Sequence, residues 1–174
     1  MASAPPLVGI VGKLPAHGDF VRRGGPAEVL ALVDRWLDAE LGKVVGEGMA
    51  LEEAVDALDG WRFRFVAPGA TALASLIASG DRVGRRFPLV ATITGSDGAE
   101  DWCAAAATAL AGVRNAGDNA DAALAALAAI PVPDEGNTDT PGWWRASGEV
   151  TPAGPDGALP TGDAFAALLT ETAP

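Results

Sequence analysis

Most of the side chains in this chain that could do chemistry lie in two short segments. The first, residues 12–23 (GKLPAHGDFVRR), holds a lysine, the only histidine, an aspartate and two arginines. The second, residues 79–87 (SGDRVGRRF), holds an aspartate and three arginines. Guanidinium groups bind carboxylates and phosphates through paired hydrogen bonds, so these segments could form an anion site or bind an acidic partner. The candidate binding residues are Lys13, His17, Asp19, Arg22, Arg23, Asp81, Arg82, Arg85 and Arg86.

The first segment also allows a catalytic interpretation, because a histidine near a carboxylate can act as a general base. Two alternatives stand beside it for His17 and Asp19. In one, Gly18 and Asp19 form a turn or cap local backbone while His17 is packed or solvated. In the other, the segment contacts a partner protein. For the second segment, the structural alternative is that Asp81 or Asp19 pairs with an arginine and fixes the loop to the sheet.

The glycines of the first segment do not form a phosphate-binding loop. That loop needs four residues between a glycine and Gly-Lys, followed by a serine or threonine that binds magnesium. Here only two residues lie between Gly9 and Gly12-Lys13, and Leu14 stands where the hydroxyl would be. The glycine spacing of a dinucleotide-binding turn is missing too, so we expect no nucleotide cofactor.

Composition excludes several other classes of site. One cysteine and one histidine exclude an intramolecular disulfide, a zinc cluster and a multi-histidine metal site. Cys103 lies among alanines on a predicted helix, where we expect it to be a buried small side chain. We therefore expect no catalytic residue, no metal and no cofactor, although an enzyme built from the two segments stays open.

The charge balance argues against nucleic acid and membrane partners. The 174 residues contain 12 basic and 23 acidic side chains, a net charge of −11, which repels phosphate backbones and anionic lipids. The longest uncharged stretch, residues 65–80, contains Pro68 and Gly69 and is too short to span a bilayer. No signal-peptide pattern precedes it. We expect a cytoplasmic protein without membrane insertion.

Charge is also unevenly distributed along the chain. Residues 1–90 have a net charge of −1, and residues 91–174 have a net charge of −10. This asymmetry indicates either a polarised binding surface or, more simply, solvated helix faces in the second half.

Hydrophobic periodicity predicts the elements that must position the two segments. Trp61, Phe63 and Phe65 alternate with arginines, which is typical of a strand with one aromatic face. We expect Trp36, Trp61, Phe63, Phe65, Leu89 and Trp102 to be buried. The expected strands are 7–11, 61–66, 87–94 and 143–145, and the expected helices are 26–44, 51–59, one ending near 113, one capped by Asp118 and one capped by Asp163.

This alternation predicts one α/β domain over residues 1–174, with helices around a mixed sheet. Residues 12–25 and 79–87 are expected to be loops. Because their acidic and basic side chains are complementary, we expect residues 12–23 and 79–87 to lie side by side at one end of the sheet. At least one carboxylate–arginine pair should link them.

Several short motifs together resemble one known family. They are GKLP (12–15) with GDF (18–20), WRF (61–63), DRVGR (81–85) with FPL (87–89), Trp143-Trp144, and Leu159-Pro160 followed by Phe165. In order and spacing they resemble the TagF family of bacterial type VI secretion system accessory proteins, over nearly the whole chain. The chain departs from the family pattern at Ala78-Ser79-Gly80, where the pattern has Pro-Ser-x.

The resemblance implies a three-layer α/β/α sandwich and a non-catalytic, post-translational negative regulator of secretion-system assembly. It implies binding to other secretion-system proteins, including a forkhead-associated-domain scaffold protein. Two alternatives remain. One is a small phosphotransfer or hydrolytic enzyme with a site formed by the 12–23 and 79–87 loops. The other is a structural subunit of the secretion apparatus.

Overall fold

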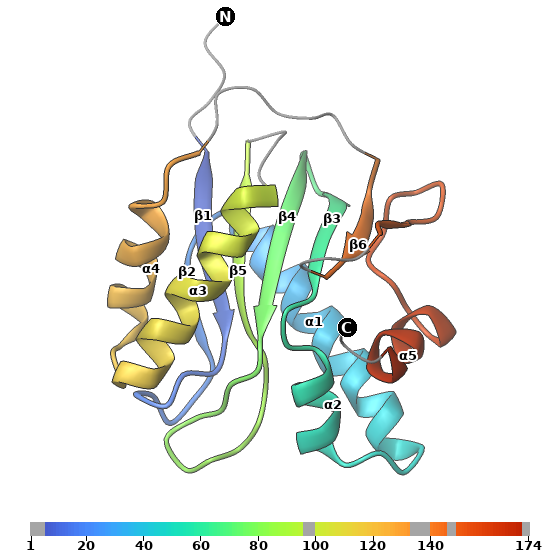
Figure 1. The fold of residues 1–174 in the computed structure, drawn as a ribbon, viewed down its shortest axis with the longest axis horizontal. Helices are drawn as coiled ribbons and strands as arrows, with labels where there is room; N and C mark the ends of the chain where they lie inside the picture. Colours follow the sequence, from blue (N-terminus) through green and yellow to red (C-terminus); the bar gives the residue numbers. More distant parts are fainter. Residues whose placement is uncertain (1–5, 96–99, 133–139, 146–148, 172–174) are drawn as a thin grey trace, which may run out of the picture.

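The computed structural model describes residues 6–95, 100–132, 140–145 and 149–171 of the chain. Within these residues the chain forms one seven-stranded sheet and five helices (Figure 1). In chain order the elements are β1 (Leu7–Gly12), β2 (Val21–Gly24), α1 (Ala27–Gly46), α2 (Leu51–Ala57), β3 (Arg62–Ala67), β4 (Ala70–Ile77), β5 (Leu89–Thr94), α3 (Glu100–Ala116), α4 (Ala120–Ala128), β6 (Gly142–Trp144), β7 (Thr151–Pro152) and α5 (Asp163–Thr170).

The strand order is β2-β1-β5-β4-β3-β6-β7, and every strand pair among the described residues is antiparallel. The predicted mixed sheet is therefore wrong. The cause is β4, a strand that the sequence analysis did not identify. It lies between the two strands that were taken as neighbours, and the Pro68-Gly69 turn folds it back onto β3, with Gly69 at φ +77°. A tight turn of this kind can only join antiparallel strands.

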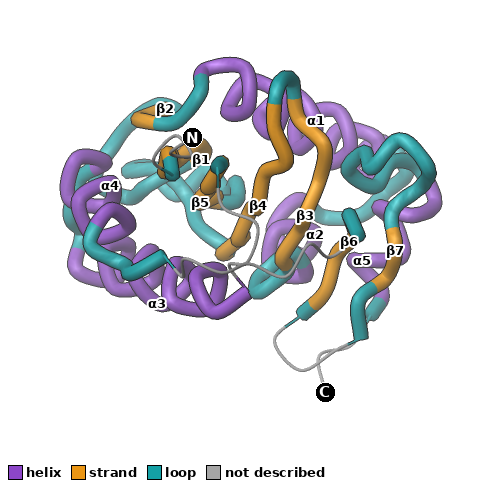
Figure 2. The backbone as a smooth tube through the Cα atoms, turned by 90° about the horizontal axis from the view of Figure 1, so that it is seen from above, coloured by secondary structure: helices purple, strands orange, loops and turns teal. Residues whose placement is uncertain are grey.

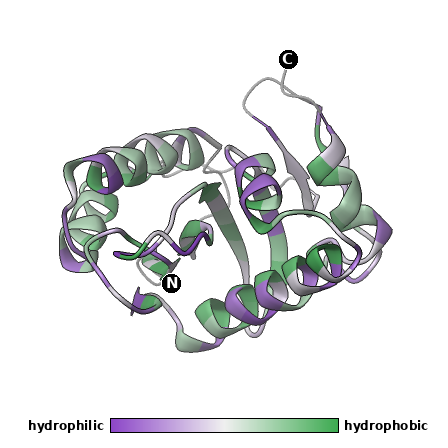
Figure 3. Cartoon of the chain, turned by 90° about the horizontal axis from the view of Figure 1, so that it is seen from below, coloured by the Kyte–Doolittle hydropathy of each residue, from purple (hydrophilic) through white to green (hydrophobic). Residues whose placement is uncertain are grey.

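Helices cover both faces of the sheet, because alternate residues of the central strands enter different cores. On β4, Ala74 and Leu76 join the cluster that contains α1, α2 and α5. Leu73 and Ile77 join the other cluster, which contains α3 and α4. Figure 2 shows α1 on one side of the strands and α3 and α4 on the other. Figure 3 shows hydrophobic residues along the central strands, as expected for a sheet with two covered faces.

The predicted core is confirmed. Trp36, Trp61, Phe63, Phe65, Leu89 and Trp102 are all buried, none more than 7% exposed. The period of 3.6 on α1 and the period of two on β3 thus identified the correct faces.

Element ends follow the sequence less closely. Residues 21–24, which were expected to belong to a loop, form β2 and pair with β1. The residue that caps α4 is Asn119, not Asp118, and its side-chain oxygen accepts a hydrogen bond from the Ala122 amide at 2.9 Å. At α5 the cap position is Gly162 rather than Asp163. Among the described helices, none combines the length and apolarity needed to cross a bilayer.

Candidate binding site at the two motif loops

The sheet brings the two motif loops to the same end of the molecule. β1 is antiparallel to β5, so the last residue of β1, Gly12, pairs with the first residue of β5, Leu89. The connection from β1 to β2, residues 13–20, and the connection from β4 to β5, residues 78–88, therefore leave the sheet at one end (Figure 1). The prediction that the two loops lie side by side is confirmed.

Hydrogen bonds join the loops along their length. The hydroxyl of Ser79, which is buried, donates a hydrogen bond to the backbone of the first loop. The backbone amide of Arg82 and the guanidinium groups of Arg82 and Arg85 also donate to that backbone. The bonds are Ser79 Oγ to the Lys13 carbonyl (2.7 Å), Arg82 N to the His17 carbonyl (2.8 Å), Arg82 Nη2 to the Ala16 carbonyl (2.7 Å) and Arg85 Nη2 to the Gly18 carbonyl (2.6 Å).

Asp81 is the centre of this arrangement, because its carboxylate is buried and fully engaged. Its Oδ1 accepts from the backbone amides of Val83 and Arg85, at 3.1 and 2.9 Å. Its Oδ2 contacts Arg85 Nε at 2.7 Å and Lys13 Nζ at 3.1 Å. The predicted inter-loop carboxylate–arginine pair is thus wrong in one detail. The arginine pair closes the second loop on itself, and the ion pair between the loops uses Lys13.

These contacts set the protonation of Asp81. Burial raises the pKa of the carboxyl, but the Arg85 amide and the charged groups of Lys13 and Arg85 outweigh it. The net result lowers the pKa of Asp81 from 3.8 to about 2. Asp81 is therefore ionised whenever the protein is folded near neutral pH, and it serves as an acceptor that holds the loops.

The lowered pKa predicts an acid-sensitive clamp. Above about pH 4 the carboxylate is ionised in both the folded and the unfolded chain, and its full stabilisation is present. As the pH falls from about 4 toward 2, the Asp81 carboxylate is protonated more readily in the unfolded chain than in the folded chain. The stabilisation that the carboxylate contributes is therefore lost over this range. We expect Asp81→Asn to melt below the wild type by a constant gap above pH 4 that closes toward pH 2. Melting curves between pH 6 and 2.5 test this, and a gap that widens in acid would contradict it.

His17 is held in the same structure and has a backbone partner. Its Nε2 accepts a hydrogen bond from the Ala120 amide at 3.0 Å, in the first turn of α4. The imidazole thus supplies an acceptor to one of the free N–H groups that begin a helix, beside the Asn119 cap. Asp19 is exposed and makes no hydrogen bond or ion pair with a described residue. The structure therefore does not form a His17–Asp19 catalytic pair.

The remaining three arginines of the candidate set form ion pairs with residues on helices and make no hydrogen bond or ion pair with Asp81 or with the carbonyl groups of residues 13–20. Their partners are carboxylates at the surface, for which ion pairs contribute about 0–1 kcal/mol each. The pairs are Arg22 with Asp34 on α1 (2.6 Å), Arg23 with Asp121 on α4 (3.5 Å) and Arg86 with Asp56 on α2.

The joined loops expose large side chains that the sequence analysis did not identify. Phe20 is 52% exposed and Val83 is 73% exposed. The Phe20 ring packs edge-on against Phe87, with centroids 4.8 Å apart, and so keeps a fixed orientation. Arg82 and Arg85 are exposed as well. We call Phe20, Arg82, Val83 and Arg85 the motif surface. The sequence does contain a feature that could have identified the exposed apolar residues: Phe20 directly follows Asp19, and Val83 directly follows Arg82, so each lies in a polar segment.

The candidate residues of this site are mostly basic: Lys13 and five arginines against Asp19 and Asp81. Across the described ranges, no group of three or more histidine, cysteine, aspartate or glutamate side chains is placed to hold one. The site's chemistry consists of guanidinium donors and apolar surface, which suits contacts with another protein.

The comparisons with known proteins agree with the motifs. The family model described as "TagF N-terminal domain, Type VI secretion system-associated" matches residues 9–130, a span that contains both loops. The chain belongs to the TagF family. It is a type VI secretion system-associated protein, as the resemblance of its motifs indicated. No curated protein matches the chain.

A solved structure is similar to this TagF-family chain over residues beyond 130 as well. The crystal structure of PA0076 from Pseudomonas aeruginosa PAO1 superposes with a TM-score of 0.72 and 25% sequence identity. The similarity covers 96% of this chain and 97% of that one. In this TagF-family chain, β6, β7 and α5 follow the span of the family model, and α5 packs into the same core as α1.

Proposed function

We propose that this TagF-family protein is a post-translational negative regulator of type VI secretion-system assembly. It acts in the cytoplasm as a single three-layer α/β/α domain and binds other secretion-system proteins, including a forkhead-associated-domain scaffold protein. The observation that carries the proposal is the motif surface. Asp81 and its partners hold the backbone of both loops in place, while the outer side chains remain exposed. A fixed surface of arginine and aromatic side chains loses little entropy on binding, and these residue types are enriched in protein interfaces.

A non-catalytic role is supported by the engagement of the reactive groups. The Lys13 ammonium lies 3.1 Å from the Asp81 carboxylate, and the residue is only 7% exposed. The His17 Nε2 lone pair accepts from a helix amide. Cys103 is buried. A general base or nucleophile would have to break one of these contacts before it reacted.

The enzyme alternative rests on one specific observation, the convergence of the two loops. A phosphotransfer or hydrolytic site would use Lys13, His17, Asp19, Arg82 and Arg85. Its experimental sign would be turnover of a small phosphoester or ester by the purified protein. A structural subunit would instead purify with the large secretion assembly in a fixed ratio.

Arg85→Glu would be a poor test of the motif surface. Arg85 supplies both a backbone amide and Nε to Asp81, so a glutamate carboxylate at position 85 would face the buried Asp81 carboxylate. Lost binding and lost structure would then coincide. Val83 is the better position, because its side chain is mostly in solvent and only its backbone contacts Asp81.

We expect Val83→Asp to fold normally and to bind the scaffold protein at least about tenfold more weakly, since a buried interface residue contributes on the order of 2 kcal/mol. Secretion should be released from repression in cells that carry this variant. Melting temperature, scaffold affinity and secreted protein are the measurements. Val150→Asp, at another exposed valine (46%), is the matched control and should leave all three unchanged. Unchanged affinity and repression in folded Val83→Asp would contradict the proposal.

A further inference from the structure

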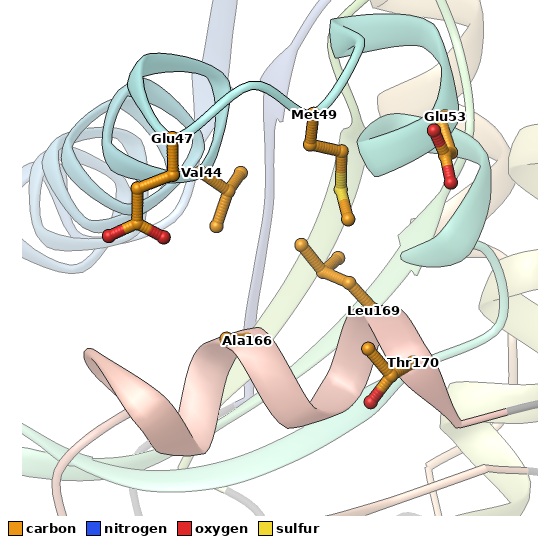
Figure 4. Close-up of a pocket in the computed structure, with 7 residues that line it drawn as sticks. All are labelled: Val44, Glu47, Met49, Glu53, Ala166, Leu169 and Thr170. Atoms are coloured by element: carbon orange, nitrogen blue, oxygen red, sulfur yellow. The ribbon is translucent and has the colours of Figure 1, made fainter.

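A groove of about 400 Å³ lies between the end of α1, the beginning of α2 and the last turns of α5 (Figure 4). It shares no lining residue with the motif surface. It is built on helices that cover one face of the sheet.

The floor of the groove is apolar and continuous with the core. Val44 is 7% exposed and belongs to the core cluster, and Met49 and Leu169 are partly buried against that cluster. Figure 4 shows the side chains of Met49 and Leu169 pointing toward one another across the groove. Methionine adapts its shape to different apolar partners, so this floor can accept more than one side-chain geometry.

The rim of the groove is acidic. Glu47 and Glu53 line it from two sides, and their carboxylates lie at opposite ends of the apolar row in Figure 4. Both residues are exposed, and neither carboxylate makes a hydrogen bond or ion pair with a described residue. No lysine or arginine is among the residues that line the groove. An apolar floor between two unpaired carboxylates is complementary to an apolar segment flanked by basic residues.

We propose that this groove binds a short amphipathic, basic segment of a partner protein. Apolar side chains of the segment fill the space above Met49 and Leu169, and its lysine or arginine residues pair with Glu47 and Glu53. This is the recognition mode of an amphipathic helix in an apolar groove. A second copy of this chain is a poor occupant, because its net charge of −11 would bring like charges together. The inference does not rest on the role proposed for the motif surface.

The test uses the full chain and a synthetic peptide of about 14 residues made of leucine and lysine, with leucines on one helical face. A peptide of the same composition with scattered leucines is the control for charge. The protein variants are Glu47→Lys/Glu53→Lys and, as a matched control, Glu28→Lys/Asp38→Lys. The control changes two exposed carboxylates on α1 that have no described partner, and it changes the net charge equally.

We expect the amphipathic peptide to shift the methyl NMR signal of Met49 and to bind the groove variant about tenfold more weakly than the wild type. The control variant should lose less than about threefold. Equal losses in both variants, equal binding of the scattered peptide or an unmoved Met49 signal would overturn the proposal. A wild-type dimer in sedimentation that the groove variant abolishes would also overturn it, because the occupant would then be a second copy.

Discussion

Replacing Gly12 by alanine is expected to destabilise the protein by at least about 3 kcal/mol, because position 12 has no space for a side chain. Gly12 has φ +130°, a conformation that other residues rarely adopt. A Cβ atom there would lie 2.0 Å from the Pro88 carbonyl oxygen and 3.0 Å from Leu89 Cα. Both are backbone atoms, so relief would require β1 to move away from β5 at the point where the motif loops begin.

The matched control is Gly42→Ala on α1, where an added Cβ would meet no atom within 4 Å other than its chain neighbours and the nearby backbone of its own helix. Alanine in a helix interior is favoured over glycine by about 0.5–1 kcal/mol, so this variant should be slightly more stable than the wild type. Urea unfolding measures both changes. A Gly12→Ala protein with the wild-type midpoint would show that the close approach of β1 to Pro88 is not required.

The surroundings of Gly12 also explain the sequence motif that contains it. The glycine and lysine of GKLP suggest phosphate binding at first sight. In the structure the glycine allows close packing of the backbone against Pro88, and Lys13 neutralises the buried Asp81. The motif residues thus build the loop pair, and four of them, Phe20, Arg82, Val83 and Arg85, keep exposed side chains.

The sequence was sufficient to predict which strands and helices carry the core, because large aromatic residues on β3 and α1 follow clear periods. It was also sufficient to predict that the two loops meet. It was not sufficient for β4, in which alanines and a serine replace the β-branched and aromatic residues that usually indicate a strand. Missing that strand changed the predicted sheet from antiparallel to mixed.

The partners of individual charges were the least predictable feature. Arg23 pairs with Asp121, and His17 contacts Ala120, about a hundred residues away in each case. Which carboxylate a guanidinium reaches depends on the packing of α4 against β1 and β2, and no local pattern encodes that packing. Local spacing did reveal that Asp81 would find a cation nearby. The choice between Lys13 and an arginine of the other loop is set by the three-dimensional course of the loops.

The second large effect is expected at Trp36, where alanine should cost about 3–5 kcal/mol. The ring meets Phe63 of β3 and Phe165 of α5 edge-on, with centroids 5.1 and 5.6 Å apart. Its Nε1 donates to the buried Pro160 carbonyl at 2.6 Å. Trp36 thus joins the sheet, α1, α5 and the segment before α5, and its removal leaves a cavity that all of them border.

Trp36→Phe separates the packing of the ring from its hydrogen bond. Phenylalanine keeps most of the apolar contact but leaves the Pro160 carbonyl without its donor, so we expect a cost of about 1–3 kcal/mol. Denaturant unfolding gives both values. In either variant, α5 should be the first element to lose its packing. Binding of the leucine–lysine peptide beside Leu169 should therefore weaken, while scaffold binding at the motif surface should persist. Equal costs for the two variants would mean that the hydrogen bond, and not the ring packing, holds α5 against the sheet.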